Sequence, residues 1–132
     1  MIGFDTNIIL RAMLDDDKTQ SPQAKDKLSS LGADQLGFIS AGVLFELFWV
    51  LESRYRLPRK AIAGVFHKLI EAAWLKFEHF DALAEALHQY ETGSADFSDA
   101  FIAEIGRATG CSATYTFDRH AARTVPGMEL LA

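Results

Sequence analysis

The sequence predicts an α/β protein built as a three-layer α/β/α sandwich around a mostly parallel sheet. Short apolar runs alternate with amphipathic stretches of about 10 to 15 residues, which is typical of strands joined by helical crossovers. About half of the 132 residues are apolar, and no linker-like stretch interrupts them, so residues 1–132 are expected to form one domain. The single cysteine, Cys111, excludes an internal disulfide and a multi-cysteine zinc site.

Each expected element has its own local signal. Strands are expected over the short apolar or β-branched runs at residues 2–4, 36–39, 75–77, 112–117 and 128–131. Helices are expected over about residues 7–14, 21–31, 40–54, 57–72, 81–93 and 98–110. Ser21 and Ser40 stand where N-caps belong, and Pro22 fits the first helical position. Gly110 occupies a helix C-cap position.

Charge and hydropathy exclude several classes of protein. A formal charge of −5 argues against a protein that coats nucleic acid by neutralising its phosphates. The most hydrophobic stretch, residues 38–51, includes a serine and a glutamate and is shorter than the roughly 20 residues that a membrane span needs. No signal peptide is visible at the N-terminus, so we expect a cytoplasmic protein. Phosphate-binding glycine motifs for nucleotides are also absent from the sequence.

Two aspartates directly follow predicted strands. Asp5 comes after residues 2–4, and Asp118 comes after residues 112–117. The carboxyl ends of parallel strands meet at the edge of the sheet where α/β proteins bind ligands, and the ends of neighbouring strands lie about 5 Å apart. Two carboxylates that close repel each other unless they are protonated or bridged by a cation. The alternative is that each aspartate only caps a following helix.

Glu46 is the single charged residue between positions 41 and 51, in a helix with no obvious polar face. We therefore expect Glu46 to be buried, which costs several kcal/mol for a lone carboxylate. An ion pair with Arg11 or Arg107 would compensate the charge, and so would a metal ion shared with Asp5.

Asp96 and Asp99 stand at the start of the last long helix. Helix-end electrostatics would account for each of them separately. However, seven acidic residues and no lysine or arginine occur between positions 78 and 104, which suggests that a positive partner comes from elsewhere. Carboxylates without histidine or cysteine partners are the ligand set of Mg²⁺ or Mn²⁺ rather than zinc. The sequence therefore predicts a Mg²⁺ or Mn²⁺ site.

Four short motifs occur in a fixed order along the chain. They are Phe-Asp-Thr-Asn at 4–7, Val-Leu-Phe-Glu-Leu at 43–47, Asp-Phe-Ser-Asp-Ala-Phe-Ile-Ala at 96–103, and Thr-Phe-Asp at 116–118. Together they resemble PIN-domain nucleases over essentially the whole chain, and the small size is similar to VapC-type toxins of bacterial toxin–antitoxin pairs. The resemblance implies a five-stranded parallel sheet between helices.

The resemblance also implies roles for individual residues. The acidic quartet that holds one or two Mg²⁺ or Mn²⁺ ions would be Asp5, Glu46, Asp99 and Asp118. Supporting polar residues would be Thr6, Asn7 and Thr116, and Asp96 would be a further carboxylate among them. Arg119 follows Asp118 directly and is expected to contact RNA phosphates, unless it only faces solvent.

The expected activity is that of a metal-dependent endoribonuclease, the toxin of a toxin–antitoxin module. Such an enzyme hydrolyses RNA phosphodiesters with a metal-activated water. The resemblance further implies a homodimer and inhibition by a small cognate antitoxin protein. The alternative is a non-catalytic module with the PIN fold that binds a partner through its hydrophobic helices, although all four quartet positions are acidic here.

Overall fold

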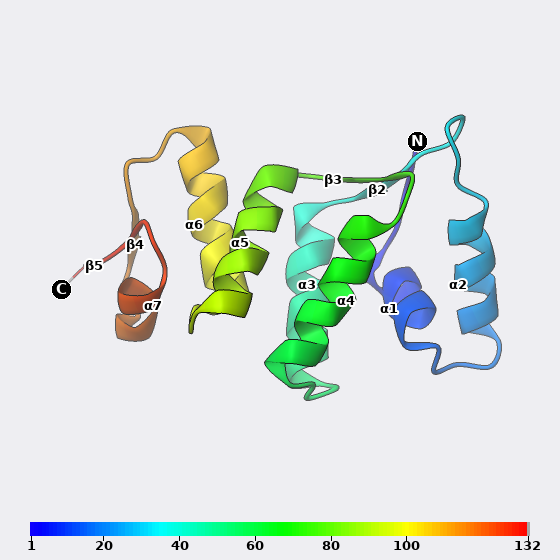
Figure 1. Cartoon of the computed structure of the whole chain (residues 1–132), viewed down its shortest axis with the longest axis horizontal. Coiled ribbons are helices and arrows are strands. Elements are labelled where there is room, and N and C mark those ends of the chain that lie inside the picture. The colour runs from blue at the N-terminus through cyan, green and yellow to red at the C-terminus, as the bar shows by residue number, and fades with distance from the viewer. Residues whose placement is uncertain (132) are drawn as a thin grey trace. The chain divides into compact units, whose positions relative to one another are not determined.

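A computed structural model of the chain describes residues 1–131 and is drawn as a ribbon in Figure 1. Helices and strands alternate along this part of the chain, as the sequence predicts. The strands are β1 (Ile2–Gly3), β2 (Gly37–Ile39), β3 (Leu75–Phe77), β4 (Thr114–Thr116) and β5 (Met128–Leu130). The helices are α1 (Thr6–Leu14), α2 (Gln20–Ser29), α3 (Ala41–Ser53), α4 (Arg59–Glu71), α5 (Phe80–Thr92), α6 (Phe97–Thr109) and α7 (Arg119–Thr124).

The strands pair in parallel, which confirms the predicted α/β class. β1, β2 and β3 form one sheet in that order, and β4 and β5 form a second sheet. In the first sheet, Gly37 of β2 lies between Ile2 of β1 and Leu75 of β3. The strands are only two or three residues long and make few hydrogen bonds to one another. Most of the buried apolar residues lie in the helices.

The chain divides into two compact units, which we describe separately. The first unit comprises residues 1–57 and 64–78 and contains β1, β2 and β3 with α1, α2, α3 and the larger part of α4. The second unit comprises residues 58–63 and 79–131 and contains α5, α6, α7, β4 and β5.

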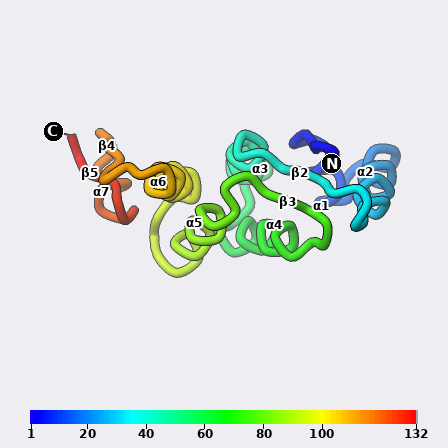
Figure 2. Tube along the Cα trace, turned by 90° about the horizontal axis from the view of Figure 1, so that it is seen from above, coloured from blue at the N-terminus to red at the C-terminus, as the bar shows by residue number. Residues whose placement is uncertain are grey.

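In the first unit, α1 and α2 lie side by side, as both views show (Figures 1 and 2). The apolar positions of α3 follow helical spacing, and Leu44, Leu47 and Leu51 are fully buried. β2 begins at Gly37, where a Cβ atom would lie 2.7 Å from the Leu75 side chain and 2.8 Å from the Phe4 ring. Only glycine fits at this position without displacing these neighbours.

The second unit is built on the pair formed by α5 and α6, which run side by side in Figures 1 and 2. Their contact includes an edge-to-face pair of Tyr90 and Phe97, whose ring centroids are 6.3 Å apart. The Arg59 guanidinium lies 4.0 Å from the centroid of the Tyr90 ring and donates to the backbone carbonyls of Tyr90, Gly93 and Ala95. Arg59 therefore places a positive charge on the carbonyl groups at the C-terminal end of α5.

α2, α5 and α6 each begin one residue earlier than predicted. α2 begins at Gln20, since Asp17 Oδ1 accepts hydrogen bonds from the backbone N–H groups of Thr19 and Gln20. Ser21 is buried inside this helix rather than capping it. α6 begins at Phe97 and is capped by Asp96, and α5 begins at Phe80, directly after His79 in the left-handed region, with no side-chain cap.

Other helix ends agree with the sequence prediction. Ser40 Oγ accepts a hydrogen bond from the Val43 N–H and caps α3. Gly110 ends α6 with a φ angle of 109°, a left-handed conformation that favours glycine. Among residues 1–131, no helix combines the length and the apolar character that crossing a membrane requires.

Candidate active site

Three of the predicted site residues are helix N-caps. Asp5 Oδ1 lies 2.8 Å from the Thr6 N atom, at the start of α1. Asp96 caps α6 and Asp118 caps α7 in the same manner, each accepting a backbone N–H from the first turn. Asp5 and Asp118 therefore do cap the helices that follow them. In the described chain the second carboxylate oxygen of each residue accepts no hydrogen bond, so capping leaves it available to another ligand.

The second unit brings Asp96, Asp99 and Asp118 into one electrostatic cluster. The pKa of Asp99 is raised above its usual value, chiefly because the carboxyl group is partly buried. The negative charges of Asp96 and Asp118 raise this pKa further, and the nearby His120 opposes them. A cation placed among these three carboxylates would relieve both the burial and the repulsion.

His120 also connects two elements of the second unit. Its Nε2 atom lies 3.1 Å from the carbonyl oxygen of Ser94, in the segment that leads into α6. Because His120 is in the first turn of α7, this contact links the helix capped by Asp118 to the helix capped by Asp96. Within residues 1–131, hydrogen bonds to backbone groups hold the acidic cluster, and no lysine or arginine pairs with its carboxylates.

The first unit holds the other two members of the predicted quartet, Asp5 and Glu46. Asp5 caps α1, Glu46 lies in the second turn of α3, and α1 packs against α3. The prediction that Glu46 is buried is wrong, because its side chain is exposed. Gly42, Glu46 and Trp49 are spaced so that they share a face of α3, and this face is open to solvent, with Trp49 54% exposed.

Among the described residues of the first unit, the ion pair of Glu46 with Arg11 is not formed. Arg11 pairs with Asp16 at 3.2 Å, and Arg107 pairs with Glu104 at 3.5 Å. Because Glu46 is exposed, its charge is solvated and needs no partner for the fold. Its carboxylate is accessible to a ligand from solvent.

The supporting residues lie next to the carboxylates that they were predicted to assist. Thr6 is buried, and within the described residues its Oγ1 atom has no hydrogen-bond partner. Asn7, the next residue of α1, is exposed. Thr116 Oγ1 accepts a hydrogen bond from the Asp118 N–H at 3.0 Å and so fixes the backbone at the end of β4. Arg119 is the exposed first residue of α7.

Glu78 is a carboxylate at the edge of the first sheet that the sequence analysis did not single out. It directly follows β3, and its Oε1 atom accepts a hydrogen bond from the Ala41 N–H at 2.8 Å. Its own N–H donates to the Ile39 carbonyl. The signal that drew attention to Asp5, an acidic residue directly after a strand, identifies Glu78 equally well.

The residues fit a hard divalent cation in type and in charge. Carboxylate, hydroxyl and amide oxygens are the ligands that Mg²⁺ and Mn²⁺ prefer. The raised pKa of Asp99 and the uncommitted oxygens of Asp96 and Asp118 show a local need for positive charge. In residues 1–131, however, no three histidine, cysteine, aspartate or glutamate side chains are already grouped as a set of metal ligands.

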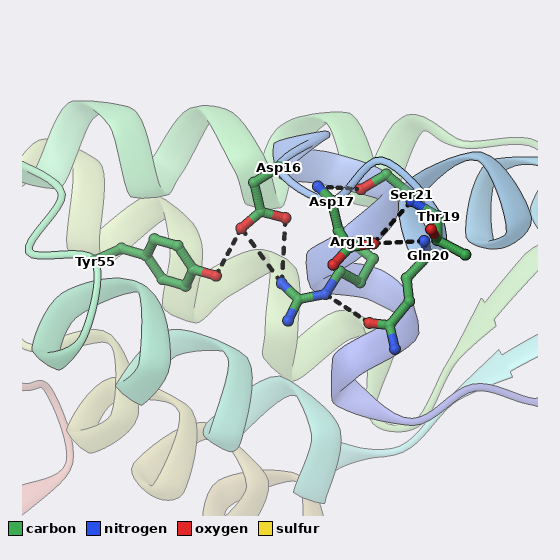
Figure 3. Close-up of polar contacts among 7 residues, drawn as sticks. All are labelled: Arg11, Asp16, Asp17, Thr19, Gln20, Ser21 and Tyr55. Carbon is green, nitrogen blue, oxygen red and sulfur yellow. Dashed lines mark hydrogen bonds and ion pairs between the residues drawn. The ribbon is translucent and has the colours of Figure 1, made fainter.

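A second group of carboxylates, in the loop between α1 and α2, has its partners in place (Figure 3). Asp16 lies between the Arg11 guanidinium and the Tyr55 hydroxyl, which donates to Asp16 at 3.0 Å. Asp15 forms an ion pair with Lys25 at 2.9 Å. The pKa of Asp17 is lowered, chiefly by the backbone N–H groups of Gln20 and Thr19. Cations and backbone N–H groups of the protein itself therefore compensate the negative charges of this loop.

Comparison with known proteins places the chain in a family. A sequence model of the PIN domain matches residues 2–125, which is nearly the whole chain and includes every predicted site residue. The chain belongs to the PIN domain family. The resemblance predicted from the four motifs is therefore confirmed at the level of the family.

The comparisons with individual proteins are more distant. The crystal structure of VapC20 from Mycobacterium tuberculosis, a toxin described as cleaving the sarcin-ricin loop, is similar to this PIN domain. The two share 21% identical residues over 93% of this chain and 94% of that chain, with a TM-score of 0.44. No curated protein matches the sequence.

Proposed function

We propose that this PIN domain is a metal-dependent endoribonuclease. The observation that carries the proposal is the cluster of Asp96, Asp99 and Asp118 in a chain of the PIN family, where partial burial and then the charges of Asp96 and Asp118 raise the pKa of Asp99. An arrangement that destabilises charged carboxylates is expected where a ligand supplies the opposite charge. The substrate we propose is RNA, whose phosphodiester bonds are hydrolysed.

Asp5, Glu46, Asp99 and Asp118 are the residues that we propose as metal ligands and catalytic residues. A bound Mg²⁺ or Mn²⁺ ion supplies Lewis acidity, which favours ionisation of a water molecule and offsets negative charge on the phosphate. Three of the four carboxylates are positioned by helix geometry, because capping fixes one oxygen of Asp5 and Asp118, and the Asp99 N–H is held by Asp96.

The neighbouring residues orient these carboxylates and the substrate. We propose that Thr6, Asn7, Asp96 and Thr116 hold the ligand set in place, since each lies within three residues of a proposed ligand. Arg119 is the residue that we propose to contact the phosphate, because its guanidinium is exposed and directly follows Asp118. In the reaction, a bond forms from the water oxygen to phosphorus and the bond to the leaving ribose oxygen breaks.

We further propose that the two compact units together make one PIN domain over residues 1–132. The family match runs without interruption through both units, from residue 2 to residue 125. The biological setting that we propose is the toxin half of a toxin–antitoxin module in the cytoplasm. In that setting the protein is a homodimer that a small cognate antitoxin inhibits.

Cleavage of a mixed RNA pool by the purified protein tests the proposal. We expect cleavage with Mg²⁺ or Mn²⁺, none with chelator, and none from Asp5→Asn or Asp99→Asn. Asp34→Asn and Asp81→Asn are matched controls, because both aspartates are exposed and belong to the same two units.

Two results would overturn the nuclease. Cleavage by Asp5→Asn and Asp99→Asn at the wild-type rate would show that the quartet is wrong. If the wild type neither binds divalent metal in calorimetry nor cleaves RNA, the protein is the non-catalytic interaction module, and the exposed face of α3 around Trp49 becomes the surface to test.

A further inference from the structure

A groove between α1 and α2 of the first unit has the composition of a nucleic-acid contact. Its volume is about 430 Å³, which is within the range of sites that hold a small ligand. The polar side chains that line it are Asn7, Arg11, Gln20, Gln23 and Lys27. No carboxylate is among the lining residues, although the chain carries a net charge of −5.

The network around Arg11 orients hydrogen-bond donors in this groove (Figure 3). Arg11 Nε donates to Gln20 Oε1 at 2.9 Å, and Nη1 donates to Asp16. Because the oxygen of the Gln20 amide is occupied, its NH₂ group is left as the available end. Within the described residues, Arg11 Nη2 also has no acceptor.

The rest of the lining combines hydrogen-bond donors with apolar surface. Lys27 and Gln23 are exposed on successive turns of α2 and face the groove. Ile8, which is 37% exposed, and the buried Ala24 are its apolar residues. A groove that binds a peptide helix normally presents a row of apolar anchors, whereas phosphates and base edges require cations and amides. Because the lining presents cations and amides and no carboxylate, RNA is the occupant that we infer.

The groove begins at Asn7, in the same first turn of α1 that Asp5 caps. We propose that single-stranded RNA lies along the α1–α2 groove, with its phosphates bound by Lys27 and by the Nη2 edge of Arg11. The amides of Gln20 and Gln23 meet the bases or the phosphates. This inference rests on the proposed ribonuclease function and extends the RNA path from Asp5 onto α2.

Binding measured without cleavage tests the groove. The probe is a fluorescein-labelled single-stranded RNA of about 12 nucleotides, followed by anisotropy in chelator so that no strand is cut. The groove variant is Gln23→Glu with Lys27→Gln, and Lys25→Gln is the matched control. Lys25 is on the same helix but pairs with Asp15 and is outside the groove lining.

We expect the groove variant to bind about tenfold more weakly and the slope of log K against log salt to fall in magnitude by about 0.7 for the lost lysine contact. Lys25→Gln should keep its affinity within about twofold and its slope unchanged. Thermal melting followed by circular dichroism checks that both variants remain folded.

Three outcomes would overturn the groove, and they separate it from the nuclease. If the groove variant binds like the wild type, or the control weakens equally, while the wild type still cleaves RNA with Mn²⁺, the groove is wrong and the nuclease stands. If a glutamate-rich peptide displaces the RNA more effectively than unlabelled RNA does, the groove binds an acidic partner. If the wild type neither binds nor cleaves RNA, the proposed function falls and the groove with it.

Discussion

Acidic side chains gather in two places in this chain, and the two places differ in what surrounds the carboxylates. In the loop between α1 and α2, Asp15 pairs with Lys25 and Asp16 pairs with Arg11. Backbone N–H groups lower the pKa of Asp17 in the same loop. In the second unit, Asp99 lies near Asp96 and Asp118, and its pKa is raised.

The difference separates a structural use of acidic residues from a functional one. In the loop, negative charge is stabilised by groups that the fold supplies, so the carboxylates contribute to holding α1 and α2 together. In the cluster, two of the carboxylates cap helices, and among the described residues no lysine or arginine forms an ion pair with the group. Natural proteins tend to leave such repulsion where a ligand relieves it.

The largest effect is expected on catalysis. Asp99→Asn should lower the rate of RNA cleavage about 100-fold or more, because it removes a charge that we propose acts in the transition state. Asp17→Asn should leave the rate within about twofold, since that carboxylate only caps α2. Initial rates with Mn²⁺ measure both. An equal loss of cleavage rate in the two variants would show that the loop and the cluster do not differ in function.

A smaller effect, on the stability of the fold, is expected from replacing Arg59, whose guanidinium binds backbone carbonyls in the second unit. Arg59→Ala should lower the free energy of unfolding by about 2 kcal/mol, because three carbonyl groups lose a charged donor and the Tyr90 ring loses its cover. Urea unfolding measures the loss. Lys60→Ala, at the next exposed position of α4, is the control and should change little.

The Arg59 guanidinium contacts backbone carbonyls and not the carboxylates of the cluster, so its effect on stability is separate from that of the cluster. Arg59→Lys should recover part of the stability, because one ammonium group cannot reach all three carbonyls as a guanidinium does. A lysine variant as unstable as the alanine variant would assign the whole effect to the guanidinium geometry.

In the metal-free protein, replacing Asp99 is expected to raise the stability of the fold modestly, whereas replacing Arg59 lowers it. A carboxyl group with a raised pKa holds its proton to higher pH in the folded chain than in the unfolded chain. The free energy of unfolding therefore falls as pH rises from about 3.8, the ordinary value, through the raised pKa of the folded state. Asp99→Asn should remove this fall and raise the melting temperature at neutral pH in chelator. A lower melting temperature would show that the charge is compensated.

The smallest effect on stability is expected from replacing Asp17. The contribution of Asp17 to stability depends on pH in the opposite direction to that of Asp99. Its pKa is lowered on folding, so its contribution is present above the ordinary value of 3.8 and is lost as pH falls through the lowered value. Asp17→Asn should therefore lower the melting temperature slightly at neutral pH and make no difference at strongly acidic pH. Equal destabilisation at both pH values would assign the effect to packing.

The sequence predicts the elements of the fold well because their signals are local. The five strands lie within or close to the predicted runs, and Ser40 and Gly110 mark helix ends as expected. The short helix α7 and the early starts of α2 and α6 were missed. In each of the last two, an aspartate before the expected start accepts the backbone N–H bonds and adds residues to the helix.

The candidate site could be predicted only in part. Asp5 and Asp118 were identified because they follow strands, and this signal depends on the local sequence alone. The predicted burial of Glu46 is wrong because the almost wholly apolar sequence of α3 predicts burial on all sides, whereas the face around Trp49 is exposed. Which face of a helix is covered depends on packing between distant segments, and the sequence of that helix does not contain this information.

The most direct test of the central claim is Mn²⁺ binding measured by calorimetry at neutral pH on three proteins. The wild type and Asp17→Asn should bind Mn²⁺ with similar affinity, since Asp17 belongs to the satisfied loop. Asp99→Asn should bind Mn²⁺ about tenfold or more weakly, because a charged oxygen ligand is lost from the cluster. Equal Mn²⁺ binding by wild type and Asp99→Asn, or loss of binding in Asp17→Asn alone, would contradict the account.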